Sequence, residues 1–264
     1  MKAIILAGGK GARLAPYTKV LPKPLMPIGD MPILEVLLRQ MKASGVDDVV
    51  LTVGHLSELL KAFFQDGHQW GLNIQYSYEE KPLGTAGPIA LVNGLNDTFL
   101  VSNGDVLTTL DLRELVCFHK GHNAIATIAS YKRRVHIDLG VLQQGGCLVT
   151  GYIEKPDIDY VVSMGIYVFE PQVLNYIPEN QYLDFPDLVL KLIAAGEKVI
   201  AFPCTGYWKD LGRPDDYEQA AEDFVHMRAQ FLPEENAELP APFHGNGHRR
   251  RPQTAAGPRG EEES

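Results

Sequence analysis

The segment LAGGKGARLAPYTKVLPKP, residues 6–24, is the most informative stretch of this chain. It follows directly on a short apolar run, residues 2–6, which is typical of a buried strand. Glycines at the end of a strand allow backbone amides to approach a phosphate closely, and prolines restrict the backbone around them. The segment carries four cationic side chains: Lys10, Arg13, Lys19 and Lys23. The sequence therefore predicts a phosphate-binding loop at the end of the first strand.

Two familiar glycine-rich motifs do not fit this segment. A P-loop requires Gly-Lys followed by Ser or Thr, and a dinucleotide-binding fingerprint requires a third glycine where Leu14 stands. Glycines alone are a weak signal, but the charge pattern is more specific. Residues 2–29 contain five basic residues and no acidic one, whereas the whole chain has a formal charge of −9. A local cationic site in an acidic chain favours phosphate ligands and argues against a general nucleic-acid-binding face.

Composition limits the class of protein. The 264 residues, 45% hydrophobic and 22% charged, are enough for one large globular domain or two small ones. We expect a cytoplasmic protein with no membrane association, because no apolar run reaches the ~20 residues of a span and no signal peptide is evident. The chain has three well-separated cysteines without a CxxC motif, so neither a disulfide framework nor a zinc site is predicted.

Short apolar runs and amphipathic stretches alternate through the first half of the chain. Strands are predicted at residues 2–6, 49–53, 73–78, 98–102 and 124–129. Helices are predicted at residues 31–43, 56–66, 86–93 and 112–119, with Asp30 and Asp111 as N-caps. This alternation predicts an α/β fold: a Rossmann-like, mixed, mostly parallel sheet flanked by helices.

The regular alternation of predicted strands and helices ends in the second half of the chain. Strands at residues 139–142, 148–153 and 165–169 predict a small strand-rich subregion added to the main sheet. Helices at 171–176, 185–195 and 214–228 and a strand at 198–202 complete a predicted domain of residues 1–231. Residues 232–264 contain almost nothing apolar and predict a disordered C-terminal tail.

Six motifs, taken together, resemble a known family. GGKGARLAPYTKVLPKPLMPI, residues 8–28, resembles the signature of the sugar-1-phosphate nucleotidylyltransferases, the pyrophosphorylases that make nucleotide-sugars. The others follow in that family's order over roughly residues 1–225: LGTAG at 83–87, NGD at 103–105, EKP at 154–156, GIYVF at 165–169 and WKDLGRPDDY at 208–217. The resemblance implies the nucleotide-diphospho-sugar transferase type of α/β fold, in which the strand-rich subregion binds the sugar.

The reaction implied by the resemblance is attack of a sugar-phosphate oxygen on the α-phosphorus of a nucleoside triphosphate, which expels pyrophosphate. Such a transfer depends on positioning and charge rather than on a covalent nucleophile. The resemblance implies two catalytic cations, with Arg13 on the departing phosphates and Lys23 on the α-phosphate. It assigns nucleotide binding to a set of loop residues: Leu6, Gly8, Gly9, Gly11, Gly84 and Thr85.

Two carboxylates are candidates for a metal site. Asp105 follows an apolar strand, and open α/β sheets bind their ligands at the carboxyl ends of strands. The resemblance implies Asp210 as the second carboxylate, so that the pair would hold Mg²⁺ between the nucleotide and the sugar phosphate. It assigns the sugar phosphate to Asn103, Gly140, Glu154 and Lys155.

The expected partners are therefore a nucleoside triphosphate and a sugar-1-phosphate or a sugar-like cyclitol phosphate, and a homo-oligomer is left open. LGTAG is commoner among guanylyl enzymes and some uridylyl enzymes, which favours GTP. Glu79, Glu80 and Lys81, just before that motif, are expected to face solvent. Three alternatives remain: thymidylyl, uridylyl, adenylyl or cytidylyl transfer to glucose-1-phosphate, transfer to a non-sugar phosphate, and a non-catalytic nucleotide-sugar sensor.

Overall fold

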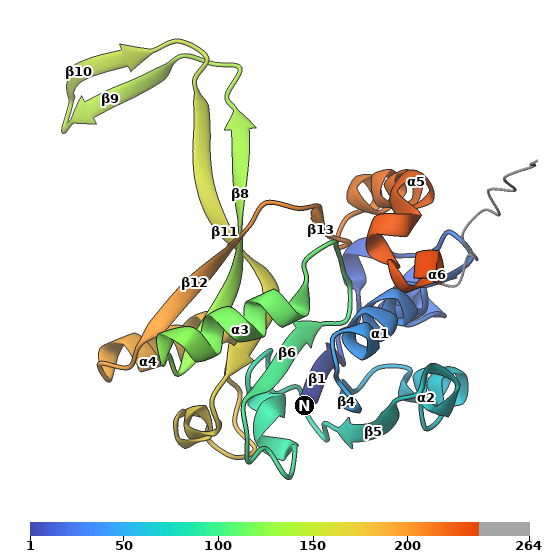
Figure 1. Ribbon diagram of the computed structural model, residues 1–264. Helices are drawn as coiled ribbons and strands as arrows, with labels where there is room; N and C mark the ends of the chain where they lie inside the picture. The colour runs from blue at the N-terminus through green and yellow to red at the C-terminus, as the bar shows by residue number, and fades with distance from the viewer. Residues whose placement is uncertain (238–264) are drawn as a thin grey trace, which may run out of the picture.

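The computed structural model describes residues 1–237 and is built on one seven-stranded sheet. Its strands are β1 (Lys2–Ala7), β4 (Asp48–Val53), β5 (Asn73–Tyr78), β6 (Phe99–Asn103), β8 (Ala126–His136), β11 (Asp157–Phe169) and β12 (Val199–Cys204). They lie in the order β12-β8-β11-β6-β1-β4-β5 (Figure 1). Only β11 runs antiparallel to its neighbours, and the other adjacent pairs are parallel. The predicted α/β fold with a mostly parallel sheet is confirmed.

Four of the described helices, the first four along the chain, pack against the sheet because each carries an apolar face at helical spacing. The α-helices are α1 (Ile33–Ala43), α2 (Ser57–Phe64), α3 (Leu112–His122), α4 (Phe185–Ala194), α5 (Pro214–Phe231) and the short α6 (Glu234–Ala237). In α1, the fully buried Leu34, Leu37, Leu38 and Met41 follow the i, i+3, i+4, i+7 pattern of a core-facing helix.

One of the two predicted N-caps is present. Asp111 caps α3, because its carboxylate accepts a hydrogen bond from the backbone N–H of Arg113 at 2.8 Å. The prediction for Asp30 is wrong: Pro32 occupies the N-cap of α1, and the Asp30 carboxylate instead pairs with Arg228 of α5. Asp30 thus forms an ion pair with a helix distant in sequence instead of the helix cap that the local sequence predicted.

Two predicted helices are only short 3₁₀ segments, Gly87–Leu91 and Pro171–Tyr176. Each contains a proline in its first two positions, and neither is long enough for a stable α-helix.

Two strands of the sheet are longer than predicted, because β8 and β11 extend well beyond the apolar runs that predicted them. Their outer halves carry charged residues, Lys132 to Arg134 on β8 and Asp157 and Asp159 on β11, so hydrophobicity alone ended the predicted strands too early.

The outer halves of β8 and β11 form an arm, defined as residues 132–162, which projects from the body of the molecule (Figure 1). Its far end is the hairpin of β9 (Val141–Gly145) and β10 (Leu148–Ile153). The arm is the predicted strand-rich subregion. Its register shifts between Ser163 and Tyr167, where Gly165 has a φ of +74°. This irregularity separates the part of β11 inside the main sheet from the part that belongs to the arm.

Three small two-stranded ladders complete the fold: β2 (Pro27–Ile28) with β3 (Met31–Pro32), β7 (Val106–Thr108) with β13 (Trp208–Asp210), and the β9–β10 hairpin. The predicted domain boundary at residue 231 lies too early. Leu232 is fully buried, and Glu235 of α6 pairs with Arg39 and Arg228. The rest of the predicted tail, residues 238–264, lies outside the described residues. None of the described helices is both long and apolar enough to cross a membrane.

Candidate active site

The glycine-rich loop begins where β1 ends, at the carboxyl edge of the sheet. β1 lies between β6 and β4, and the backbone N–H of Gly104 donates to the carbonyl of Leu6 at 3.0 Å. The end of β6 is therefore held against the start of the loop. Gly11 adopts a φ of +59°, and a Cβ there would lie 2.8 Å from Thr18 Cγ2. Glycine at this position permits both the left-handed backbone and the tight packing of the loop on itself.

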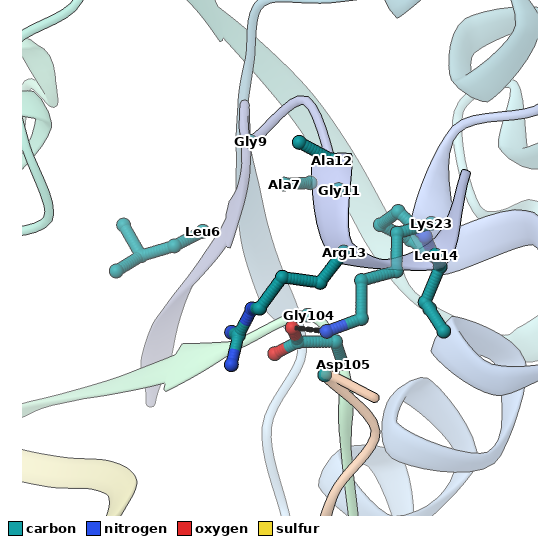
Figure 2. A pocket seen from close by; sticks show the side chains of 12 residues that line it. Leu6, Ala7, Gly9, Gly11, Ala12, Arg13, Leu14, Lys23, Gly104 and Asp105 are labelled. Carbon is teal, nitrogen blue, oxygen red and sulfur yellow. Dashed lines mark hydrogen bonds and ion pairs between the residues drawn. The ribbon is translucent and has the colours of Figure 1, made fainter. Parts of the chain in front are cut away.

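Two cationic side chains of the loop point to one place, the side chain of Asp105 (Figure 2). Lys23 stands on a 3₁₀ turn between Pro22 and Pro24, and its ammonium forms an ion pair with Asp105. Arg13 belongs to the preceding 3₁₀ turn, and its guanidinium packs against Gly212, where a Cβ would lie 2.8 Å from the Nη2 atom. The prolines and the missing side chain of Gly212 fix where these charges lie.

Asp210 reaches this site through a short antiparallel ladder. β7 begins directly after Asp105, and β13 pairs with it so that Asp210 lies opposite Val106. The backbone N–H of Leu211 also donates to the carbonyl of Asp105 at 3.1 Å. The structure thus brings together two carboxylates that lie far apart in the sequence. Lys23 Nζ contacts Asp105 and lies 3.8 Å from Asp210 Oδ1.

The electrostatics of this cluster are those of a site that needs positive charge. Burial, followed by the negative charge of Asp105, raises the pKa of Asp210, while Lys23 and Arg13 act in the opposite direction. The side chain of Lys23 is only 8% exposed. Arg13, Lys23 and Asp105 line a cavity of about 270 Å³ together with Leu6, Gly9 and Gly11.

The cluster suits a divalent cation. Carboxylate oxygens are the donors that Mg²⁺ prefers, and Asp105 and Asp210 already share one cationic partner. Within residues 1–237, no group of three or more His, Cys, Asp or Glu side chains forms a metal site. Two carboxylates nevertheless suffice for Mg²⁺ when phosphates and waters supply the remaining ligands. The residues present therefore fit the expected metal.

A larger cavity of about 760 Å³ adjoins the first and shares Leu6, Gly9 and Asp105 with it. Its lining includes several residues that sequence analysis assigned to substrates: Gly8, Gly84, Thr85 and Asn103. Thr52 of β4 also lines it, and its buried hydroxyl has no hydrogen-bond partner. The predicted nucleotide residues thus surround two connected cavities.

The LGTAG loop on one side of the larger cavity is anchored to the start of α4. Thr85 donates to the carboxylate of Asp184 from its backbone N–H at 2.9 Å and its hydroxyl at 3.1 Å. Gly84 has a φ of +79°, and a Cβ there would lie 2.6 Å from the carbonyl oxygen of Leu183. The loop therefore approaches the backbone of residue 183 in a way that only glycine allows.

Glu79 corrects the expectation that this stretch faces solvent. Its side chain is half-buried in the larger cavity, where one carboxylate oxygen accepts a hydrogen bond from the backbone N–H of Leu83 at 2.9 Å. Burial raises the pKa of Glu79, although the hydrogen bond from Leu83 partly opposes this. Gly8 permits the arrangement, because a Cβ there would lie 2.7 Å from Glu79 Oε1. Glu80 is exposed, as expected.

A signal for Glu79 was present in the sequence. Glu79 comes directly after the strand predicted at residues 73–78, and Asp105 comes soon after the strand predicted at residues 98–102. Because parallel strands end at the same edge of a sheet, residues that follow them gather at one site. The same reasoning that selected Asp105 therefore applies to Glu79.

The expected sugar residues on the arm lie apart from the cluster. Gly140, Glu154 and Lys155 flank the β9–β10 hairpin, and none of them lines either of the two cavities described. Lys155 pairs with Asp138 at 2.6 Å, and Glu154 accepts a hydrogen bond from the hydroxyl of Tyr152 at 3.0 Å. The structure thus brings together the nucleotide, cation and metal candidates but not these three residues.

Comparison with known proteins identifies the class to which this site belongs. The family model for nucleotidyl transferases matches residues 2–226, so the chain belongs to the nucleotidyl transferase family. Two curated relatives are nucleotidyltransferases that are named for sugar-1-phosphates. A UTP–glucose-1-phosphate uridylyltransferase of Synechocystis sp. is 38% identical, over 83% of this chain and 62% of that protein. A mannose-1-phosphate guanylyltransferase of Mycobacterium tuberculosis is 36% identical, over 84% of this chain and 64% of that protein.

The chain is similar to these sugar-1-phosphate nucleotidyltransferases and spans less than two thirds of their length. Solved structures agree on the fold. A putative glucose-1-phosphate thymidylyltransferase from Bacillus anthracis has a TM-score of 0.68 and 26% identity, over 84% of this chain and 94% of that one. A UDP-glucose pyrophosphorylase has a TM-score of 0.65 and 19% identity, over 86% and 99%.

Proposed function

We propose that this protein transfers a nucleoside monophosphate from a nucleoside triphosphate to a sugar-1-phosphate or a sugar-like cyclitol phosphate, releasing pyrophosphate. One observation carries the proposal: Arg13 and Lys23 converge on Asp105 in a cavity that adjoins a larger one at the same sheet edge. The larger cavity has room for a nucleoside and the smaller for its phosphates. The cytoplasm, where nucleoside triphosphates are abundant, is the proposed compartment.

The protein's own groups would act mainly by position and charge. Arg13 presents a planar fork suited to the departing phosphate oxygens, and Lys23 presents a compact charge to the α-phosphate. A Mg²⁺ ion held by Asp105 and Asp210 would supply Lewis-acid stabilisation of the charge that develops on phosphate. Lys155 of the arm is the proposed contact for the acceptor phosphate, and Glu154 and Gly140 are the proposed contacts for the sugar.

GTP is the proposed nucleotide, and Glu79 supports this choice. Guanine presents two adjacent donors, N1–H and the N2 amino group, on its Watson–Crick edge. An ionised carboxylate has two acceptor oxygens and no donor, which matches that edge and matches no other common base. A hydrogen bond to a charged group is worth about 1.5–3 kcal/mol, so the match gives roughly ten- to a hundredfold discrimination.

The proposal is tested by measuring pyrophosphate release with five nucleoside triphosphates against mannose, glucose, heptose and cyclitol phosphates. Release is expected to be fastest with GTP. Absence of release with every pair would overturn the catalytic proposal, and faster release with UTP or dTTP would overturn the choice of base alone.

The role of Glu79 has a matched control in its neighbour. Glu79→Gln replaces one acceptor by a donor, so kcat/KM for GTP is expected to fall at least tenfold relative to UTP, on the order of one lost charged hydrogen bond. Glu80 also lines the larger cavity, but its side chain is exposed and makes no hydrogen bond in the described structure, so Glu80→Gln is expected to leave the ratio unchanged. Equal GTP-to-UTP ratios in the wild type and in Glu79→Gln would show that Glu79 does not read the base.

A further inference from the structure

Lys23 is held between the two carboxylates that would bind the metal. Its ammonium pairs with Asp105 and lies 3.8 Å from Asp210 Oδ1. The residue is 7% exposed, so water does little to stabilise its charge and the carboxylates must do so. The turn that carries Lys23 is flanked by Pro22 and Pro24, which keeps its backbone in place.

The carboxylates in turn depend on a nearby cation. Asp105 and Asp210 both lie within 4 Å of the same ammonium, so two negative charges are crowded here. Arg13 does not neutralise the carboxylates in the same way. Its guanidinium packs against Gly212 and forms no ion pair with either carboxylate in the described structure. Among the described residues, the cation that pairs with these carboxylates is Lys23.

We propose that Lys23 competes with the divalent cation for Asp105 and Asp210, so that the nucleotide-free protein binds metal weakly. An ammonium and a divalent cation within a few ångströms of each other repel, and burial strengthens that repulsion. A triphosphate removes the conflict, because its negative oxygens provide Lys23 with a second set of partners. Metal and nucleotide therefore enter together. The inference rests on the metal site of the proposed function.

The competition assigns two states to one side chain. Without nucleotide, Lys23 holds two like charges side by side at the site. With nucleotide, the same ammonium turns to the α-phosphate and leaves both carboxylates to the cation. The required displacement is confined to a side chain, because the backbone of the turn is restrained on both sides by proline.

The test measures direct binding of Mn²⁺ to the full chain without nucleotide. Binding is monitored by electron paramagnetic resonance as a loss of the free-ion signal. Lys23→Met and the polar Lys23→Gln both remove the competing charge, and each is expected to bind Mn²⁺ at least tenfold more tightly than the wild type. Lys23→Arg retains the charge and is expected to bind as weakly as the wild type.

Two controls locate the effect. Lys19→Met removes an equal charge from the same loop, where the exposed Lys19 forms no ion pair in the described structure, and is expected to bind Mn²⁺ like the wild type. Adding Asp105→Asn to Lys23→Met is expected to abolish the gain. Thermal melting identifies any variant that does not fold, and two neutral substitutions are used so that one such loss does not decide the result.

The failure of this inference is distinguishable from failure of the proposed function. Pyrophosphate release that survives removal of divalent cations by EDTA would overturn the metal site, and the competition with it. Release that requires a metal, combined with Lys23→Met and Lys23→Gln binding Mn²⁺ no more tightly than the wild type, would overturn the competition alone.

Discussion

Two lysine–aspartate pairs, one in the body of the protein and one on the arm, differ in burial rather than in chemistry. Lys23 pairs with Asp105 in a cavity, and its side chain is 8% exposed. Lys155 pairs with Asp138 at 2.6 Å, with side chains 53% and 75% exposed. Exposed pairs contribute little because water competes for both charges, whereas loss of one partner of a buried pair leaves a costly charge. The first pair therefore limits where its charges lie, and the second leaves Lys155 free to exchange partners.

The largest contrast is expected from removal of one carboxylate in each pair. Asp105→Asn removes a proposed metal ligand from the site, and kcat is expected to fall on the order of a thousandfold. Asp138→Asn breaks only the exposed pair and is expected to leave kcat within about twofold, as is usual for surface changes. Steady-state pyrophosphate release measures both. A fall of less than tenfold in a folded Asp105→Asn protein would remove Asp105 from the metal site.

Two glycine substitutions compare how tightly the backbone is packed in the body of the protein and in the arm. Gly84→Ala places a Cβ 2.6 Å from the Leu183 carbonyl oxygen at a φ of +79°, and is expected to lower the free energy of unfolding by about 2 kcal/mol. Gly145→Ala, in the arm, meets only Thr150 Cγ2 at 3.9 Å and is expected to change it by less than about 0.5 kcal/mol. Urea denaturation gives both values. Equal effects would show that the arm is packed as tightly as the LGTAG loop.

The smallest expected effect concerns the arm's contribution to the acceptor. Lys155→Ala is expected to raise KM for the sugar phosphate by about tenfold, the value of one charge-assisted hydrogen bond, while KM for the nucleoside triphosphate stays unchanged. Lys132→Ala, which removes another arm lysine paired with an aspartate, is the matched control and is expected to leave both KM values unchanged. Unchanged KM values in Lys155→Ala would exclude the arm lysine from the acceptor site.

Local sequence carried enough information for the body of the fold and for part of the site. The sheet could be predicted from the buried apolar runs of β1, β4 and β6. The glycine-rich loop after β1 and the position of Asp105 after β6 predicted that Arg13, Lys23 and Asp105 lie at the same edge of that sheet. The meeting of Asp105 with Asp210 was implied only by resemblance, because it depends on the three-residue strands β7 and β13. Strands so short have no periodicity that a sequence can display.

The remaining differences have a common physical cause, which is contact between residues distant in sequence. Asp30 pairs with Arg228 instead of capping α1, and Glu235 pairs with Arg39 instead of lying in a tail. Glu79 is half-buried because Gly8 leaves it space. The local sequence indicated a helix cap for Asp30, an exposed position for Glu79 and a disordered tail for Glu235, and only tertiary structure supplies the contacts that these side chains make instead.

The charges on one face of the arm have a consequence for association between molecules. Beyond Tyr131 on β8 and before Ile166 on β11, the arm's two outer edges have no further strand partner among the described residues. Unpaired edges with exposed apolar side chains invite strands from other chains. Lys132 and Arg134 on one strand pair with Asp159 on the other, at 2.7 Å each, and place fixed charges along these edges. They add little stability to the arm, but charged side chains near its edges oppose pairing with strands of other chains.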